Sequence, residues 1–194
     1  VIDITNPASP SIVEHMEMGY YAVGVATGED QVYGVDSVVG LEVIDATNPA
    51  SPPIVGSVGT PSEAVGIAVA GSHAYVAASG TGLQVIDITN PAAPSIIGSV
   101  DTGGVAYGVA VMGALAYVAS GVAGLQVIGI VNPASPSIVG SVDTPGVARD
   151  VVLMGNYAYI ADWDSGLVVI DVSNPASPSI VGRVDTPFHR AIDV

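Results

Sequence analysis

Aspartate recurs at one fixed place along the chain, which points to acid–base or metal chemistry. Asp3, Asp45, Asp87 and Asp171 each end the same apolar motif, at spacings that are multiples of 42 residues. A ring of carboxylates offers the oxygen ligands that calcium prefers and the groups that general acid–base catalysis uses. The structural alternative is that each Asp accepts hydrogen bonds from backbone amides of the following turn. Because Gly129 interrupts the series, we predict the structural role.

The remaining candidates for chemistry match no known catalytic spacing. Asp101, Asp143 and Asp185 begin short turns before Thr and then Pro or Gly, which predicts turn starters, with calcium as a secondary reading. The three histidines fall at three different places of the repeat, and no EF-hand loop, HExxH pair, GxSxG elbow or phosphate-binding glycine loop occurs. We therefore expect no cofactor and no catalysis. A hydrolase or lyase with a central-channel site, built from several repeats, stays as an alternative.

The elements that must position these residues repeat with a constant period. The motif that opens the chain as VIDITNPASPSIV begins again every 42 residues, at Val1, Val43, Val85, Val127 and Val169. Repeated sequence at a fixed step is typical of solenoids and propellers, so the period decides the fold class before any single residue does.

One period contains four short runs that are rich in valine, isoleucine and tyrosine, as β-strands are. In the third full unit these runs are 105–111, 115–120, 125–130 and 137–142. Turn signals that contain glycine or NPASP separate them, and no run has the 3.6-residue period of a helix.

Both faces of each predicted small sheet are partly apolar. Leu125 and Val127 share one face of their strand, whereas Ile128 and Ile130 share the other. Identical four-stranded sheets bury both faces if they pack against each other around an axis, which predicts an all-β fold, a β-propeller of four-stranded antiparallel blades. A β-solenoid is the competing fold, but its rungs are usually nearer about 20 to 30 residues.

The same motif resembles a known family. LQVID at 83–87 and LVVID at 167–171, with AYVA before them and NPASP after them, resemble the LVIVD repeat of β-propeller-like surface proteins of bacteria and archaea. The resemblance covers the whole chain, and Gly129 departs from it where the motif has Asp. It implies a propeller, an extracellular or cell-surface location and an interaction role, and it implies no particular reaction.

Composition excludes several classes of protein. The chain has 18 acidic and 3 basic residues, a formal net charge of −15, no cysteine and 49% hydrophobic residues. So apolar a chain can bury enough surface to fold, which excludes a disordered acidic tail. Three arginines cannot neutralise many phosphates, so no nucleic-acid partner and no anionic membrane surface are expected. The lack of cysteine excludes a disulfide scaffold.

One long stretch, 102–142, has no charged side chain and no histidine. A hydropathy window over 104–130 could be read as a membrane span, but the same places in neighbouring units hold charged residues. We predict a neutral blade, 104–145, with no membrane span in this segment. Such a blade offers a surface for self-association.

The period also sets the expected blade boundaries. The full units are 20–61, 62–103, 104–145 and 146–187, and a fifth unit is divided between 1–19 and 188–194. The divided unit lacks one of its four strands. This predicts either a piece of a longer chain or a five-bladed ring that closes imperfectly.

Residues that differ between units are not needed for the common scaffold and can serve a specific function. The largest differences fall in the loops between the second and third strands and in the connections between units, which a meander would put on one rim of the fold. This rim gains the single Trp, the single Phe, two adjacent Tyr and an Arg-Asp pair at 149–150. Aromatic and arginine side chains are enriched where interfaces bind most strongly. The predicted partner-binding residues are Glu14, Glu17, Tyr20, Tyr21, Asp162, Trp163, Asp164, Phe188, His189 and Arg190. Drift of terminal repeats is the alternative explanation.

These observations predict a non-catalytic extracellular or cell-surface scaffold that binds a protein or polymer partner through this rim. Trp163 and the Tyr20–Tyr21 pair would act as packing anchors, and a closed ring would bring Trp163, Phe188 and Tyr20 into one sector. The acidic residues of the set would attract a basic patch. The alternative, of another class, is a structural spacer or self-assembly module of a surface or filament protein, stacked through the unit 104–145.

Overall fold

The structure is a computed structural model that describes residues 1–28, 30–186 and 191–194. Every regular element in these residues is a β-strand. The strands form four four-stranded antiparallel sheets and one two-stranded sheet. The all-β, propeller-like fold predicted from the period is confirmed.

Each four-stranded sheet is a simple meander, and we call the sheets blades 1 to 4 in chain order. Blade 1 contains β3 (Ala22–Thr27), β4 (Gln31–Asp36), β5 (Gly40–Asp45) and β6 (Ile54–Val58). Blade 2 contains β7 (Gly66–Ala70), β8 (His73–Ala77), β9 (Leu83–Asp87) and β10 (Ser95–Val100). Blade 3 contains β11 (Gly108–Met112), β12 (Leu115–Ala119), β13 (Leu125–Gly129) and β14 (Ser137–Val142). Blade 4 contains β15 (Asp150–Met154), β16 (Tyr157–Ala161), β17 (Leu167–Asp171) and β18 (Ser179–Val184).

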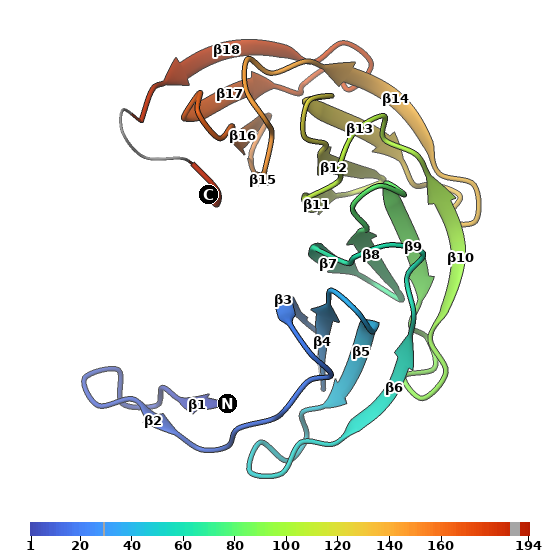
Figure 1. Cartoon of the computed structure of the whole chain (residues 1–194), viewed down its shortest axis with the longest axis vertical. Coiled ribbons are helices and arrows are strands. Elements are labelled where there is room, and N and C mark those ends of the chain that lie inside the picture. Colours follow the sequence, from blue (N-terminus) through green and yellow to red (C-terminus); the bar gives the residue numbers. More distant parts are fainter. Residues whose placement is uncertain (29, 187–190) are drawn as a thin grey trace.

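The blades follow one another along an open arc (Figure 1). The first strand of each blade, β3, β7, β11 or β15, lies on the inside of the arc, and the last strand lies on the outside. Before blade 1, β1 (Ile2–Asp3) and β2 (Ser11–Ile12) form the separate two-stranded sheet. This pair and blade 4 lie at opposite ends of the arc (Figure 1).

The first strand of blade 3 is shorter than predicted. The prediction began it at residue 105, whereas β11 begins at Gly108. The residues before β11 turn toward the preceding blade, where Ala106 forms an isolated β-bridge with Ser79. Ala148 and Gly121 form the equivalent bridge before β15, so the neighbouring blade partly fixes where β11 and β15 begin.

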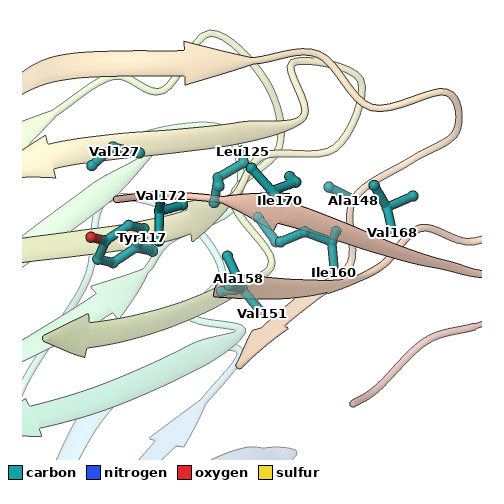
Figure 2. Packing of buried hydrophobic residues seen from close by; sticks show 11 residues of the cluster. Tyr117, Leu125, Val127, Ala148, Val151, Ala158, Ile160, Val168, Ile170 and Val172 are labelled. Atoms are coloured by element: carbon teal, nitrogen blue, oxygen red, sulfur yellow. The ribbon is translucent and has the colours of Figure 1, made fainter. Parts of the chain in front are cut away.

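The apolar core lies between blades, as expected for sheets that are apolar on both faces. Between blades 3 and 4, Tyr117 and Leu125 pack against Val151, Ile160 and other residues of blade 4 (Figure 2). Equivalent clusters join blades 2 and 3 and blades 1 and 2. Burial of apolar surface contributes about 25 cal/mol per Å², so these junctions hold the arc together.

A glycine in the outer strand allows each blade to approach the next. A Cβ added to Gly56, Gly98 or Gly140 would collide with a proline carbonyl in the NPASP or NPAAP turn of the following blade. Gly182, at the same place in blade 4, has only Val169 of its own blade within range. The IVG glycine and the proline turn of the motif therefore serve one contact, the junction between successive blades.

Candidate functional site

The loops of the predicted rim lie together in the structure. In blades 2, 3 and 4, the loop between the second and third strands contacts the segment that follows the last strand of the blade. The contacts are the isolated bridges Ser79↔Ala106, Gly121↔Ala148 and Trp163↔Ala191. The same loops also contact the segment that leads into their own blade, since the Ser120 hydroxyl donates a hydrogen bond to Thr102 Oγ1 at 2.8 Å. The rim is therefore a continuous backbone scaffold on which the departures from the repeat are displayed.

Tyr20 and Tyr21 combine a fixed backbone with exposed rings. The buried Asp36 carboxylate accepts hydrogen bonds from the backbone N–H groups of Tyr20, at 2.7 Å, and Tyr21. It also accepts the N–H groups of Val38, at 2.8 Å, and Val39, at 2.9 Å. Burial tends to raise the pKa of Asp36, but these four donors outweigh it and hold the pKa below its ordinary value. Tyr20 and Tyr21 are nevertheless 72% and 70% exposed.

Trp163 is half-buried, because its ring packs on a neighbouring cation. The Arg149 guanidinium carbon lies 4.0 Å from the centroid of the Trp163 ring and 4.1 Å from the centroid of the Tyr107 ring. Arg149 is thus held between two aromatic side chains, a geometry that cation–π attraction favours. Arg149 departs from the repeat, but neither it nor Tyr107 belongs to the predicted set of partner-binding residues. The signal that could have indicated Arg149 is its charge, because the same place of the repeat holds the apolar residues Val23 and Val65.

The backbone at Trp163 has an uncommon conformation for a bulky residue. Its φ is 45°, in the left-handed region, and the equivalent residues Ser79 and Gly121 have φ of 36° and 55°. Glycine adopts this region without strain, whereas other residues do so at a cost of about 1–3 kcal/mol. The repeat therefore fixes the backbone first, and blade 4 places its indole on a strained turn.

Asp162 and Asp164, which flank Trp163, differ in their surroundings. Asp162 is buried, and it accepts hydrogen bonds from Thr144 Oγ1 at 2.5 Å and from the Gly146 N–H at 2.7 Å. Its carboxylate therefore stabilises the rim loops. Asp164 is exposed.

The predicted residues do not form one cluster. Glu17 and Tyr20 line a cavity on blade 1, whereas Trp163 packs in blade 4, at the other end of the arc. Glu14 is half-buried and Glu17 is exposed. The expectation that Trp163 and Tyr20 share one sector applies to a closed ring, and this open arc does not test it. The predicted residues Phe188, His189 and Arg190 lie outside the described residues.

Three charged residues at the inside of the arc line one cavity of about 380 Å³. Valine, isoleucine and glycine from blades 1 to 3 line most of it, and Arg149, Asp150 and Asp193 supply its charges. Burial, followed by a hydrogen bond with the Asp193 side chain, raises the pKa of Asp150. Glycine stands at the place of Asp150 in the three preceding blades, so only blade 4 of these four contributes this carboxyl.

The recurrent aspartates have the predicted structural role wherever their side chains are described. Asp45, Asp87 and Asp171 each accept the backbone N–H of the residue two positions later, at 2.8–2.9 Å. The hydroxyl of that Thr or Ser, followed by the N–H, lowers the pKa of each carboxyl. These carboxylates close the turn before NPASP or NPAAP.

Two negative findings hold within the described part of the chain. No group of three or more His, Asp or Glu side chains there has the geometry to hold a metal ion. None of the described residues belongs to a helix with the length and hydropathy to cross a bilayer.

The repeats match a family model along nearly the whole chain. Five successive matches to the LVIVD repeat cover 1–17, 19–60, 61–102, 103–144 and 145–186. The chain belongs to the LVIVD-repeat family. No curated protein matches the chain. The LVIVD repeats thus identify a repeat scaffold, and they assign no activity.

Two designed proteins of known structure have a similar fold. The computationally designed Ika8 protein superposes with a TM-score of 0.70 at 10% identity, over 89% of this chain and 51% of its own. The designed Ika4 protein gives a TM-score of 0.66 at 11% identity, over 79% of this chain and 92% of its own. This LVIVD-repeat chain therefore spans about half the length of Ika8. At such low identity the likeness concerns the fold alone.

Proposed function

We propose that this LVIVD-repeat protein is a non-catalytic scaffold of the cell surface or extracellular space that binds a protein or polymer partner through its rim. The observation that carries the proposal is the Tyr20–Tyr21 pair. Asp36 holds the backbone of both residues while Tyr20 and Tyr21 are 72% and 70% exposed. Rigid aromatic side chains offer contact area at little entropic cost, which is why they serve as binding anchors.

Charge and the second aromatic position also support the proposal. Glu17 lies near the tyrosines, and the net charge of −15 favours a partner with a basic patch. Trp163, strained at the other end of the rim and packed on Arg149, adds a second aromatic position. An extended partner, such as a polymer or a long protein segment, could contact both ends of the arc.

The test is a binding screen with matched variants. The immobilised wild-type protein is screened against an array of basic peptides and polysaccharides, and every hit is measured again on Tyr20→Ser/Tyr21→Ser. Tyr157→Ser is the control, because Tyr157 is also an exposed tyrosine but lies at the start of β16 in blade 4, away from Tyr20 and Tyr21. The proposal predicts hits that the double variant loses and the control keeps. Hits that all three proteins bind equally would contradict it.

A specific observation also favours a second candidate, acid–base catalysis as a hydrolase or lyase at the inner cavity. A carboxyl with a raised pKa, beside a second carboxyl and an arginine, is a combination that general acids use. The candidate predicts turnover of a substrate in a hydrolase and lyase panel that Asp150→Asn abolishes. Turnover that is absent, or unchanged in Asp150→Asn, would exclude it.

The spacer alternative depends on blade 3. Its uncharged surface exposes Val122 and Val131, which are 75% and 84% exposed, in loops on the two sides of the blade. Stacking through these loops predicts a mass that rises with concentration in sedimentation experiments and falls back in Val122→Lys/Val131→Lys. A mass that stays monomeric at every concentration would exclude it.

A further inference from the structure

Three departures from the repeat meet where blades 3 and 4 adjoin. The place that holds Val23 in blade 1 and Val65 in blade 2 holds Tyr107 in blade 3 and Arg149 in blade 4. Trp163 stands where blades 1 to 3 have serine or glycine. The two rings lie on either side of the Arg149 guanidinium, and we call this arrangement the arginine stack. Blades 1 and 2 have none of these side chains, so the scaffold does not need the stack.

The arginine stack holds a buried hydrogen-bond donor that has no partner. Nε of Arg149 is buried and makes no hydrogen bond within the described part of the chain. A guanidinium has its five N–H donors in its own plane, so rings over its faces cannot satisfy them. The rings restrict its orientation, however, and a fixed planar fork is the group that binds a carboxylate through two parallel hydrogen bonds.

Arg149 also lines the cavity of about 380 Å³ on the inside of the arc. This volume is within the range of about 300–1,000 Å³ that is typical of small-molecule sites. The inner strands β3, β7 and β11 are edge strands of their sheets, so one side of each has backbone N–H and C=O groups without a sheet partner. Because Gly24, Gly66 and Gly108 are part of the lining, a ligand can approach this backbone closely. Such groups bind hydroxyls.

The acidic surroundings favour a ligand with a single negative charge. The Asp150 carboxyl lies against Gly108 at the cavity, and burial, followed by a hydrogen bond with Asp193, raises its pKa. In either protonation state it can form a hydrogen bond with a hydroxyl. The net charge of −15 repels a phosphate dianion more strongly than a carboxylate. One carboxylate with several hydroxyls is therefore the chemistry that this cavity fits.

We propose that Arg149 and the inner cavity bind a sugar acid, a uronate, with the guanidinium on its carboxylate and Asp150 and the inner-strand backbone on its hydroxyls. The arginine stack positions the guanidinium. The strained backbone of Trp163 is consistent with such a role, because strain gathers at binding sites. The site requires no catalysis, and it does not depend on the Tyr20–Tyr21 pair that carries the rim proposal.

Trp163 is the only tryptophan of the chain, so its fluorescence reports on the site directly. Titration of the intact chain with D-glucuronate should give a saturable change with a Kd of about 1 mM or tighter. D-glucose lacks the carboxylate and acetate lacks the hydroxyls, so each should bind at least about tenfold more weakly. No saturation by glucuronate up to about 50 mM, or equal affinity for glucose or acetate, would overturn the proposal.

Variants of Arg149 locate the carboxylate, with calorimetry as the measurement because Arg149 contacts the fluorophore. Arg149→Lys keeps the charge but loses the planar fork, and it should weaken glucuronate binding about tenfold. Arg183→Lys, at an exposed arginine of β18, is the control and should bind as the wild type does. Unchanged affinity in Arg149→Lys would contradict the proposal.

A second variant leaves the arginine stack untouched. Val65→Glu adds a carboxylate to the cavity wall, and it should weaken glucuronate binding about tenfold or more through repulsion. Val131→Glu, at an exposed valine outside the cavity, should not change the affinity. Circular dichroism and urea unfolding check that the variants fold. Equal affinity in Val65→Glu and the wild type would place the ligand outside the cavity and overturn the proposal.

Two further measurements separate the sources of the uronate and the two binding proposals. A uronate oligomer that binds at least as tightly as glucuronate identifies an acidic polysaccharide as the ligand, whereas binding of the monosaccharide alone identifies a free sugar acid. Tyr20→Ser/Tyr21→Ser should keep its affinity for glucuronate, because neither tyrosine lines this cavity. Loss of glucuronate binding in the double variant would assign the sugar to the tyrosine pair and overturn the cavity site.

Discussion

At the scale of single residues, Asp36 and Asp162 show how a carboxylate in a candidate site can serve the backbone. They occupy the same place in blades 1 and 4, where blades 2 and 3 have Ala78 and Ser120. Each is buried and accepts hydrogen bonds from rim N–H groups. The departure from the repeat is therefore a change in how the loop is held, and in blade 1 it positions the exposed tyrosines.

Replacing Asp162 tests this role. Asp162→Ala leaves Thr144 Oγ1 and the Gly146 N–H without their acceptor, so the free energy of unfolding should fall by about 1–3 kcal/mol. Urea unfolding measures the change. Glu63→Ala is the control, at an exposed residue, and should stay within about 0.5 kcal/mol of wild type. A variant as stable as the control would show that these bonds do not hold the rim.

Asp150 gives a dependence of stability on pH. Its raised pKa, caused by burial and then by the hydrogen bond with Asp193, means that the folded state binds a proton more tightly than the unfolded state does. The group therefore stabilises the fold below its unfolded pKa, and this contribution is lost as the pH rises through the folded pKa. At neutral pH the ionised Asp150 carboxylate therefore destabilises the folded state.

Asp150→Asn removes this destabilising negative charge and nearly keeps the shape of the side chain. The Tm of Asp150→Asn should exceed the wild-type Tm at neutral pH, and the difference should shrink toward pH about 3, where the wild-type carboxyl is protonated. Thermal unfolding across this range measures it, with Asp143→Asn, at an exposed turn residue, as the control. A lower Tm for Asp150→Asn at neutral pH would contradict the assignment.

At the scale of elements, the junction between blades depends on a glycine of the outer strand. Gly98 lies against the carbonyl of Pro133 in the next blade, whereas Gly182 is at the end of the arc. The two glycines have the same place in their blades, so the chain contains its own control. A methyl group at Gly98 must push the blades apart, and one at Gly182 meets only Val169 at ordinary contact distance.

Gly98→Ala should therefore lower the free energy of unfolding by about 1–3 kcal/mol, as overpacking of a tight contact does. Gly182→Ala should be neutral or slightly stabilising, because alanine reduces the freedom of the unfolded chain. Chemical unfolding of both variants measures the two effects. Equal effects of the two substitutions would show that the glycine serves its own strand and not the junction.

Period and alternation predict these elements because they act in every unit. The 42-residue step, the paired apolar faces and the turn role of Asp45, Asp87 and Asp171 follow from local chemistry that each copy repeats. The candidate site is harder, because it depends on contacts between units. Nothing local in the sequence indicates that Asp162 is buried or that Arg149 is held between Tyr107 and Trp163.

At the scale of the whole molecule, the account depends on blades that follow one another around an axis. The inner strands of neighbouring blades lie side by side along the arc, and the core lies in the junctions (Figure 1). Ser57, Ser99 and Ser141 recur at one place of the outer strand, are exposed and are 42 residues apart. They are suitable reporters of curvature, since the chain has no cysteine that would compete for a label.

Distances between spin labels on cysteine pairs at these serines test the central claim most directly. The pairs 57/99 and 99/141 should give equal distances, because each spans one junction. The pair 57/141 should give a distance clearly shorter than their sum, because the three blades lie on an arc. A distance for 57/141 equal to that sum would describe a straight stack of repeats and would contradict the propeller-like arrangement.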